Sequence, residues 1–564
     1  MTSPTRPRPP RPLPRSRALP RSRAPLATAS LGTVLASLAL AACAGGTSGG
    51  GTGGTPVQGG TITYAHVQEP PCIFGGWIQQ AYISRQVLDG LVTEDEDGSV
   101  KPWLATSWKT SPDGLTYTFT LKDGVKFTDG TPLDAEAVAY NFEQFEHSDL
   151  NGTAKVSIDP YYKKAEAVDA THVAIHLHKP YPEFLRLITQ GYFGIQSAHA
   201  LKTRTKEQNC ERPIGSGAFT VEKWNKGQNV LFRKNPGYTS WPATAKHKGP
   251  AYVDTIDWKF VADGTSRYAS LTTGQSDVIY EVPTVNWKDA RARFRNTIRY
   301  ITPGHPVSFY LNTQQGPFTD KLVRQAFARA ADREAAVDAG FHGVIPYEPN
   351  PSVSQSTPGY LDTDPYPYDP AEAAQLLKRA GWSRGAGGIY AKDGRKLRVR
   401  LVYGPGYQFT SEGATVLQAL QEQWRQNGFD VTLVPATQAE SWGGTYSTPD
   451  SYDTQASYWT SPSPAILWII WRESTKDNPN GNNHSFYNDS SLTRLIDRAN
   501  TNTDTAAGFG QYKQAQKVVN DEAAGVGLYT QNTLIAVSDK LHGFWVEKSQ
   551  GEPVFSDAYF TGKR

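Results

Sequence analysis

The chain contains 564 residues, of which 38% are hydrophobic, 20% charged and 11% aromatic. This composition is typical of a folded, water-soluble protein of two or three domains and excludes a disordered or collagen-like chain. The formal net charge of +3 is misleading, because seven arginines and no acidic residue precede residue 24. From residue 43 onward there are 50 basic and 54 acidic residues, so the body lacks the basic excess expected of a nucleic-acid-binding protein.

The first 42 residues have the pattern of a secretory signal peptide. An Arg- and Pro-rich region is followed by an Ala-, Leu- and Val-rich stretch over 25–42, which is shorter than the roughly 20 predominantly apolar residues of a membrane-spanning helix. The stretch ends in Leu40-Ala41-Ala42-Cys43, which resembles a bacterial lipobox. That resemblance implies cleavage before Cys43 and attachment of a lipid such as a palmitate-bearing diacylglyceryl group. An ordinary cleavage site with an incidental cysteine is the alternative.

A Gly-rich segment follows Cys43. Residues 44–60 include nine glycines, and a chain of this kind behaves as a flexible coil. We therefore interpret residues 43–60 as a lipidated cysteine and its tether. The tether would hold a soluble body at the outer face of the cell membrane, with the lipid as the membrane contact.

Cys72 and Cys210 are the two remaining cysteines. An even pair in an exported protein favours a disulfide over two free thiols. Two thiols this far apart in the sequence do not match the spacing of a thiolate metal site.

Along the body, periodicity predicts several elements. Residues 61–65 and 115–121 alternate apolar and polar side chains, which is typical of half-buried strands. Asp113-Gly114 predicts a tight turn before the second strand. Asp134 is placed to cap a helix that begins at about residue 135.

Three histidines fall on one face of a further predicted strand at 172–178. They are His172, His176 and His178, and they alternate with Val173, Ile175 and Leu177. Histidine is a common metal ligand. We nevertheless expect an outward polar face rather than a metal site, because the alternation alone explains the pattern.

One segment of about 45 residues closely resembles the extracellular solute-binding proteins of family 5, the binding components of ABC importers for peptides, nickel and oligosaccharides. The family's landmarks occur here in order as Trp108, Asp113-Gly114, the run 124–132 (GVKFTDGTP) and the helix start 135–138 (AEAV). Further landmarks keep the family order, namely residues 214–219 (IGSGAF), 323–326 (VRQA) and 368–370 (YDP). The resemblance covers about 58–564.

The resemblance implies a periplasmic-binding-protein-like α/β fold. Two lobes would be joined by a hinge and would close on a ligand cleft, with an enlarged first lobe. The expected division is domain I at 58–100, 200–302 and 535–564, domain II at 101–199 and domain III at 303–534. The resemblance also supports the Cys72–Cys210 disulfide, because some dipeptide-binding members have a bridge at the corresponding place.

A ligand cleft needs apolar walls and a few polar groups, and aromatic side chains provide both. We expect ligand contacts from the aromatic residues of domain III and, from the first lobe, from Trp77; the domain III candidates are Tyr407, Trp442, Tyr446, Tyr458 and Trp459. The alternative for each is a place in the core. Dipeptide-binding members hold the peptide ammonium with an Asp and its carboxylate with an Arg. Here the strand end at 458–464 (YWTSPSP) has no acid, and the Arg position falls near Tyr407.

These features predict a lipid-anchored receptor that captures a peptide longer than, or unlike, a simple dipeptide and delivers it to an ABC permease and its ATPase subunits. An oligosaccharide or other polar solute is the alternative ligand, and a peptide-sensing signalling receptor is the alternative role. No catalytic motif supports a secreted hydrolase, so we expect neither enzymatic activity nor a cofactor or metal. We expect a monomer that does not bind nucleic acid.

Overall fold

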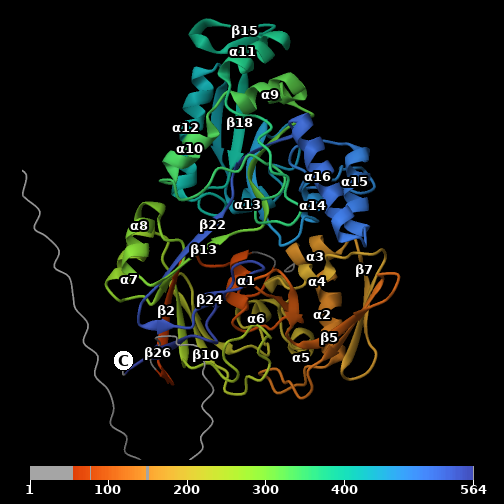
Figure 1. The fold of residues 1–564 in the computed structure, drawn as a ribbon, viewed down its shortest axis with the longest axis vertical. Coiled ribbons are helices and arrows are strands. Elements are labelled where there is room, and N and C mark those ends of the chain that lie inside the picture. The colour runs from red at the N-terminus through yellow and green to blue at the C-terminus, as the bar shows by residue number, and fades with distance from the viewer. Residues whose placement is uncertain (1–54, 76–77, 148–151, 563–564) are drawn as a thin grey trace, which may run out of the picture. The chain divides into compact units, whose positions relative to one another are not determined.

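The structure is a computed structural model of the full chain, and it describes residues 55–75, 78–147 and 152–562 (Figure 1). The predicted signal peptide, Cys43 and Trp77 lie outside the described residues. In the described ranges, no helix combines the length and apolar character needed to cross a bilayer.

The first large sheet has seven strands. The predicted strand at 61–65 is confirmed as β2 (Thr61–His66), which pairs in parallel with β11 and β12 near the middle of the sheet. In sheet order the strands are β13 (Asn296–Ile301), β22 (Asn532–Val537), β12 (Val278–Ile279), β2, β11 (Thr255–Phe260), β10 (Asn229–Lys234) and β9 (Phe219–Asn225).

A four-stranded antiparallel sheet belongs to the same lobe. Its strand β6 (Thr116–Leu121) buries Tyr117, Phe119 and Leu121, as the alternation predicts. The sheet order is β5 (Ala105–Thr110), β6, β8 (His172–Leu177) and β7 (Tyr162–Ala167). The Asp134 carboxylate accepts the Ala137 amide at 2.9 Å at the start of α2 (Ala135–His147), which confirms the predicted cap.

One hydrophobic core joins these two sheets. Phe119 and Phe142 of the four-stranded part belong to the same buried cluster as Tyr64 and Trp258 of the seven-stranded part. We call this unit lobe 1. Its other elements are α1 (Ile78–Ser84), α3 (Gly152–Ile158), α4 (Phe184–Leu187), η2 (Gly191–Phe193), α5 (Ala198–Thr203), α6 (Lys206–Glu211), α7 (Gly264–Thr272), α8 (Thr284–Arg293), the pair β3 (Val92–Glu94) and β4 (Val100–Pro102), the pair β24 (Trp545–Val546) and β25 (Pro553–Val554), and the small sheet of β1 (Pro56–Val57), β26 (Tyr559–Thr561) and β23 (Leu541–His542).

The second lobe, lobe 2, is built on a five-stranded mixed sheet with its own core around Phe309, Phe327 and Trp424. The strand order is β19 (Asp430–Pro435), β18 (Arg398–Tyr403), β20 (Thr454–Thr460), β14 (Gly304–Leu311) and β21 (Gly525–Tyr529). In Figure 1 the helices α9 (Lys321–Arg329), α10 (Arg333–Gly340), α11 (Pro370–Arg379) and α12 (Ser411–Gln426) lie around β18. Smaller elements are η3 (Gly316–Thr319), η4 (Ala386–Gly388), α13 (Gln438–Trp442) and the strands β15 (Ser383–Arg384), β16 (Tyr390–Lys392) and β17 (Arg395–Lys396).

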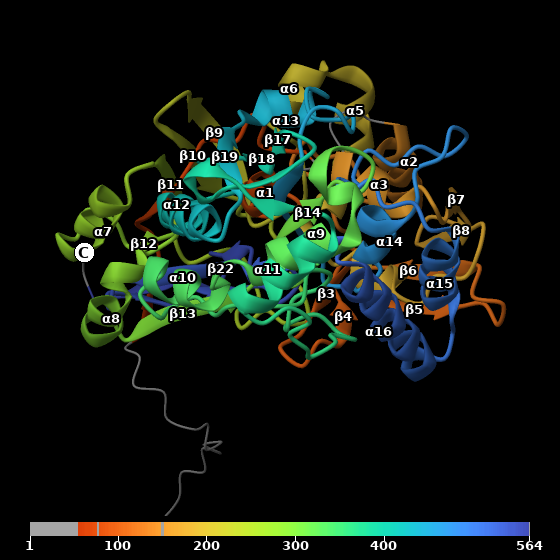
Figure 2. The same ribbon diagram turned by 90° about the horizontal axis from the view of Figure 1, so that it is seen from above.

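Three further helices of lobe 2 form a separate apolar cluster (Figure 2). They are α14 (Ile466–Trp471), α15 (Ser490–Thr501) and α16 (Thr505–Glu522), and they pack around the buried side chains of Trp471 and Tyr512. Trp471 is therefore a core residue.

The chain passes between the lobes twice in the described ranges. Residues 302–303 connect β13 to β14, and residues 530–531 connect β21 back to β22. The two crossings are joined by a hydrogen bond from the Thr302 amide to the Gln531 carbonyl at 2.9 Å. This pairing places the hinge of the two-lobed fold between residues 301 and 304 and between 529 and 532.

The sheets allow a comparison with the expected domain boundaries. The strand β22 begins at Asn532, which pairs with Ile301, so the return to the seven-stranded sheet comes a few residues before 535. The boundary at 100/101 falls within β4. With these shifts, we retain the three-part division as a proposal.

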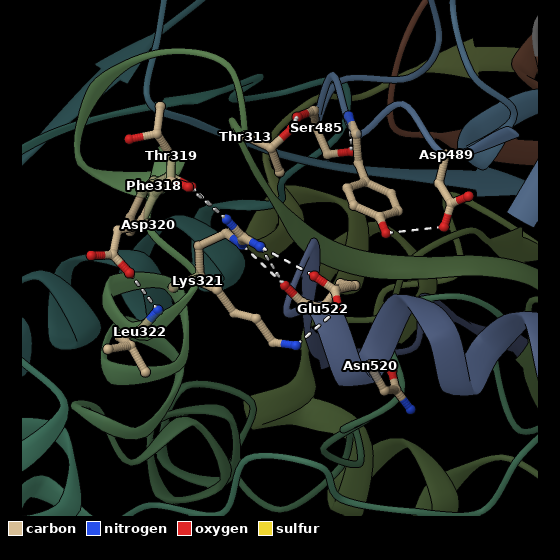
Figure 3. A network of polar contacts seen from close by, with 12 residues as sticks. Thr313, Phe318, Thr319, Asp320, Lys321, Leu322, Ser485, Asp489, Asn520 and Glu522 are labelled. Atoms are coloured by element: carbon tan, nitrogen blue, oxygen red, sulfur yellow. Dashed lines mark hydrogen bonds and ion pairs between the residues drawn. The ribbon is translucent and has the colours of Figure 1, made fainter. Parts of the chain in front are cut away.

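Arg324, from the VRQA segment, connects the start of α9 to the end of α16, the region in which Figure 3 shows Lys321 pointing toward Glu522. Its side chain is 5% exposed. The guanidinium donates from Nε and Nη2 to the Glu522 carbonyl at 3.0 and 2.8 Å and from Nη1 to the Phe318 carbonyl at 2.8 Å. Lys321 adds an ion pair to the Glu522 carboxylate at 2.9 Å. The start of α9 is thereby fixed to the end of α16, immediately before β21.

Gly304 generates a test of the hinge. Its φ is +114°, and a Cβ there would lie 2.4 Å from both the Trp459 carbonyl oxygen and the Ser461 amide nitrogen. We expect Gly304→Ala to lower the free energy of unfolding, because it adds a backbone clash to a strained φ. Urea unfolding is the measurement. The control is Gly227→Ala, whose φ is +74° with no atom within 4 Å of the added Cβ. An equal loss in both variants would contradict the close approach at Gly304.

Candidate ligand-binding site

The candidate residues of lobe 2 lie where parallel strands end. The strands β18, β19 and β20 are parallel to one another, and their carboxyl ends are Tyr403, Pro435 and Thr460. Tyr407 lies in the segment that follows β18, and Tyr446 lies in the segment that follows β19. Tyr458 is two residues before the end of β20. In open α/β sheets, ligands bind beyond the carboxyl ends of the strands. Sequence reasoning therefore selected residues at the expected edge of the sheet.

Tyr407 and Tyr446 form one group at this edge. The Tyr407 hydroxyl is 2.5 Å from Ser441 Oγ, and burial raises the pKa of the Tyr407 phenol, with Tyr446 among the smaller contributors. Next to Tyr407, Gln408 Nε2 donates to Ser457 Oγ at 2.9 Å, which fixes this loop to β20. Trp442 ends α13 in the same region.

Tyr458 and Trp459 point to different surroundings, because neighbouring residues of a strand face opposite sides. Tyr458 packs on the core of lobe 2 and lies near Tyr280 and Tyr192 of lobe 1. Trp459 instead lines a small cavity with Tyr161 and Tyr181, which belong to the four-stranded part of lobe 1. Tyr458 therefore faces the seven-stranded sheet, whereas Trp459 faces a separate space.

Lobe 1 contributes aromatic residues that sequence reasoning missed. His66 ends β2, and its ring lies 4.5 Å from the Tyr280 ring and 6.4 Å from the Tyr82 ring, measured between centroids. Burial lowers the pKa of His66 to about 3, so the ring is neutral at physiological pH. The one sequence signal for Tyr280 is that it follows the short strand Val278–Ile279. Nothing in the local pattern marks Tyr82 of α1.

Hydrogen bonds join the lobes near this aromatic group. The Glu412 carboxylate at the start of α12 accepts the Thr284 amide at 2.9 Å and the Thr284 hydroxyl at 2.7 Å. The Thr284 hydroxyl is also 3.0 Å from His342 Nδ1, and the hydroxyls of Tyr192 and Thr460 are 3.5 Å apart. Because these hydrogen bonds connect the two lobes, the structure shows the lobes in a closed arrangement.

A second contact between the lobes lies beside the cavity of Trp459. Lys179 pairs with Asp497 and lies 4.9 Å from the Trp468 ring centroid. The Asn500 side chain donates to the Tyr161 hydroxyl at 2.5 Å and accepts from the Tyr512 hydroxyl at 2.5 Å. Because these polar groups satisfy one another, the contact serves to hold α15 against the four-stranded part.

The histidines of β8 have carboxylate partners. His172 Nδ1 lies 2.9 Å from the Asp169 carboxylate, and His176 Nε2 lies 3.0 Å from Glu166. The histidines of β8 are not among the groups with the geometry to hold a metal; in the described part of the chain that group is Glu143, Glu146 and His147 on α2. Glu143 already accepts the Tyr162 hydroxyl and the Ala165 amide, so this group has a structural role in lobe 1.

Cys72 and Cys210 are joined in the structure, with their Cα atoms 5.0 Å apart. The adjacent backbone is also paired, since the Ile73 amide donates to the Cys210 carbonyl at 2.9 Å. The bond connects the segment before α1 to the end of α6. It therefore constrains the approach to the helix that holds Tyr82.

Comparison with known proteins identifies the family of this chain. The model of the family described as "Bacterial extracellular solute-binding proteins, family 5 Middle" matches residues 99–487. The chain belongs to family 5 of the extracellular solute-binding proteins. This family 5 protein is 28% identical over 481 residues to the glutathione-binding protein GsiB of Salmonella typhi, a match that covers 83% of the chain and 88% of GsiB.

Solved structures of the family confirm the fold. The oligopeptide-binding protein AppA from Bacillus subtilis, solved with a nonapeptide, has a TM-score of 0.76 at 23% identity and matches over 90% of this chain and all of AppA. NikA from Brucella suis, solved with Fe(III)-EDTA, has a TM-score of 0.76 at 22% identity and matches over 89% of this chain and all of NikA. The family 5 protein is thus a two-lobed, periplasmic-binding-protein-like α/β protein with an enlarged first lobe.

The disulfide is tested by removing it. We expect Cys72→Ala/Cys210→Ala to lower the free energy of unfolding by about 2–4 kcal/mol, because the bond closes a long loop in the unfolded chain. Urea unfolding of the chain from residue 44 measures the loss, and adding a reductant to the unaltered protein is the matched control. Intact mass after alkylation without reduction reports the bond directly. Two alkylated thiols in the native protein would contradict it.

Proposed function

We propose that this protein is the lipid-anchored substrate-binding component of an ABC importer, and that it captures peptides longer than, or unlike, simple dipeptides. The observation that carries the proposal is the tyrosine-rich interface between the lobes. The rings of Tyr82 and Tyr280 of lobe 1 lie 5.7 Å apart between centroids, and Tyr280 contributes to the raised pKa of Tyr458 of lobe 2. Such walls bind large areas of a ligand at low entropic cost. These tyrosines lie close to the hinge, which consists of the two short crossings at 302–303 and 530–531.

The proposed mechanism is capture by closure. In the open state the lobes separate about the crossings at 302–303 and 530–531, and solvent enters between them. Ligand bound to one lobe is buried when the other closes, and the bonds from Thr284 to Glu412 then form across the mouth. The closed form is the one that a permease would recognise. No step in this sequence requires catalysis.

The membrane attachment in this proposal comes from the sequence. Cleavage before Cys43 and lipidation of its thiol would leave the body on a Gly-rich tether at the outer face of the membrane. The tether leaves lobe 1 and lobe 2 free to move relative to each other. The protein would work as a monomer beside its permease.

We infer the ligand class from the sequence at the end of β20, where 458–464 (YWTSPSP) has no acid, and from the arginine position of dipeptide-binding members, which falls near Tyr407. The Tyr407 hydroxyl is engaged with Ser441. Relatives and solved structures with diverse ligands match this chain, including AppA with a nonapeptide and the glutathione-binding protein GsiB. A longer peptide, held through its backbone and aromatic contacts, fits these groups better than a dipeptide of fixed length. An oligosaccharide or other uncharged polar solute is the alternative ligand.

Native mass spectrometry tests this function. The mature chain from residue 44, purified without refolding, is expected to carry a discrete added mass that matches peptides, and a synthetic pentapeptide pool is expected to raise its unfolding temperature. Tyr458→Ala should weaken the shift at least tenfold in ligand concentration, because it removes a wall of the site. The matched control is Tyr368→Ala, since Tyr368 is 47% exposed. A hexose ladder would replace peptides by oligosaccharides, and a bare mass with no response to the pool would refute peptide capture.

A further inference from the structure

Glu281 is a carboxylate placed between the lobes without a hydrogen-bonding partner in the described part of the chain. It follows β12 and Tyr280, and 21% of its side-chain surface is accessible. It lies three residues before Thr284, whose amide and hydroxyl donate to Glu412 of lobe 2. Its nearest cation is Arg267, at 4.0 Å from Nη2 to Oε2. A carboxylate in this position loses hydration without gaining a hydrogen bond, which is costly.

The backbone presents this side chain in a strained conformation. The φ of Glu281 is +54°, a value that residues with a side chain rarely adopt. The conformation is held from both sides, because Arg267 donates to the Glu281 carbonyl at 3.0 Å and the Val282 amide donates to the Leu534 carbonyl at 2.8 Å. Strain that the surroundings maintain in this way is typical of functional positions.

Arg267 pairs with the Glu281 carboxylate at 4.0 Å without a hydrogen bond to it. Its side chain is 4% exposed, and its nitrogens donate to backbone carbonyls of Tyr280, Val261, Ala262 and Glu281 at 2.7–3.0 Å. Its charge is thus bound into the loop that shapes Glu281. Other deeply buried acids are better satisfied: Asp89 accepts from two serine hydroxyls, and Glu348 accepts from Tyr360, Thr530 and two backbone amides.

The charge of Glu281 acts on tyrosines of both lobes. It contributes to the raised phenol pKa of Tyr64 and Tyr280 on lobe 1 and of Tyr458 and Tyr529 on lobe 2. Burial raises the pKa of Glu281, Arg267 opposes that shift, and Glu412 adds to it. Glu412, in contrast, already accepts two hydrogen bonds from Thr284.

We propose that Glu281 binds a positively charged group of the cargo, an ammonium in the first instance, inside the closed site. This inference rests on the proposed function and names the chemistry of its ligand. A carboxylate in a tyrosine-rich interface suits an organic cation, because the charge gains an ion pair and tyrosine rings attract cations. The acid comes from lobe 1 and lies close to the contact of Thr284 with Glu412 of lobe 2, so a cation bound to it would favour closure.

Binding to matched probes tests the proposal. The probes are a pool of synthetic pentapeptides with free amino termini, the same pool N-acetylated and free of lysine and arginine, and the cations spermidine and choline. Calorimetry compares the unaltered protein with Glu281→Gln. We expect the protein to bind the free-amine pool at least tenfold more tightly than the acetylated pool. Glu281→Gln should lose that tenfold preference and bind the acetylated pool unchanged.

Two controls separate a ligand role from a structural one. The ligand-free Glu281→Gln variant is expected to unfold at the same or a higher temperature, because it removes a charge that accepts no hydrogen bond from the described residues. A lower temperature together with unchanged preference would show that the ion pair with Arg267 is structural. Glu222→Gln is the matched control, since Glu222 is an exposed acid of β9 paired with Arg233. It should bind every probe as the unaltered protein does.

The outcomes also distinguish this inference from the proposed function. Equal binding of both pools by the unaltered protein overturns the role of Glu281 and leaves peptide capture in place. Binding of spermidine or choline alone, lost in Glu281→Gln, supports the role of Glu281 and refutes peptides as the cargo. Failure to bind any cationic probe overturns the inference.

Discussion

The hydrogen bond between the two crossings is the constraint on which the rest of the structure depends. The Thr302 amide and the Gln531 carbonyl hold the outward and return segments together at 2.9 Å. Segment 348–357 braces them: Glu348 accepts the Thr530 hydroxyl, and the Ser354 hydroxyl donates to the Thr302 carbonyl. The lobes have separate cores. In the proposed mechanism, each lobe therefore moves as a rigid body about these short segments, and the paired crossings keep the same alignment when the lobes close.

The ligand site follows from this register. The crossings lead into β14 and β22, which pair with β20, the strand of Tyr458, and with β12, the strand that precedes Tyr280. Gly304 brings the first crossing into contact with the backbone at Trp459 and Ser461, so the end of β20 is positioned by the hinge itself. In the proposed mechanism, rotation about the hinge moves these aromatic residues, so the lobes close and bury the ligand in one step.

Local features were predictable from the sequence because their causes are local. The alternation at 115–121 and the cap at Asp134 depend on neighbours within a few residues, and both were confirmed. The motif at 124–132 gave the family and, through it, the lobes. The return to lobe 1 was placed at 535 rather than 532 because the pairing of Asn532 with Ile301 is a long-range property.

The site was only partly predictable for the same reason. The aromatic residues at the strand ends of lobe 2 lie in sequence segments rich in Trp and Tyr, so composition marks them. Glu281 is one acid among 54. The role proposed for it rests on its position between the lobes and on its electrostatic effect on Tyr458 and Tyr529, which are more than 170 positions away in the sequence. Strand alternation predicts that Trp459 faces the side opposite to Tyr458. The cavity that Trp459 lines could not be predicted, because it forms only when the four-stranded part of lobe 1 packs beside it.

The most direct test of the account is the distance between the lobes. Spin labels on Val285→Cys in α8 and Gln418→Cys in α12, both at exposed positions, flank the contact between Thr284 and Glu412. Double electron–electron resonance would measure the distance distribution between the two labels. It would be compared between protein freed of ligand by unfolding and refolding and protein saturated with the pentapeptide pool. We predict a longer, broader distance distribution without ligand and a single shorter distance with it. Identical distributions in both samples would contradict capture by closure about the paired crossings.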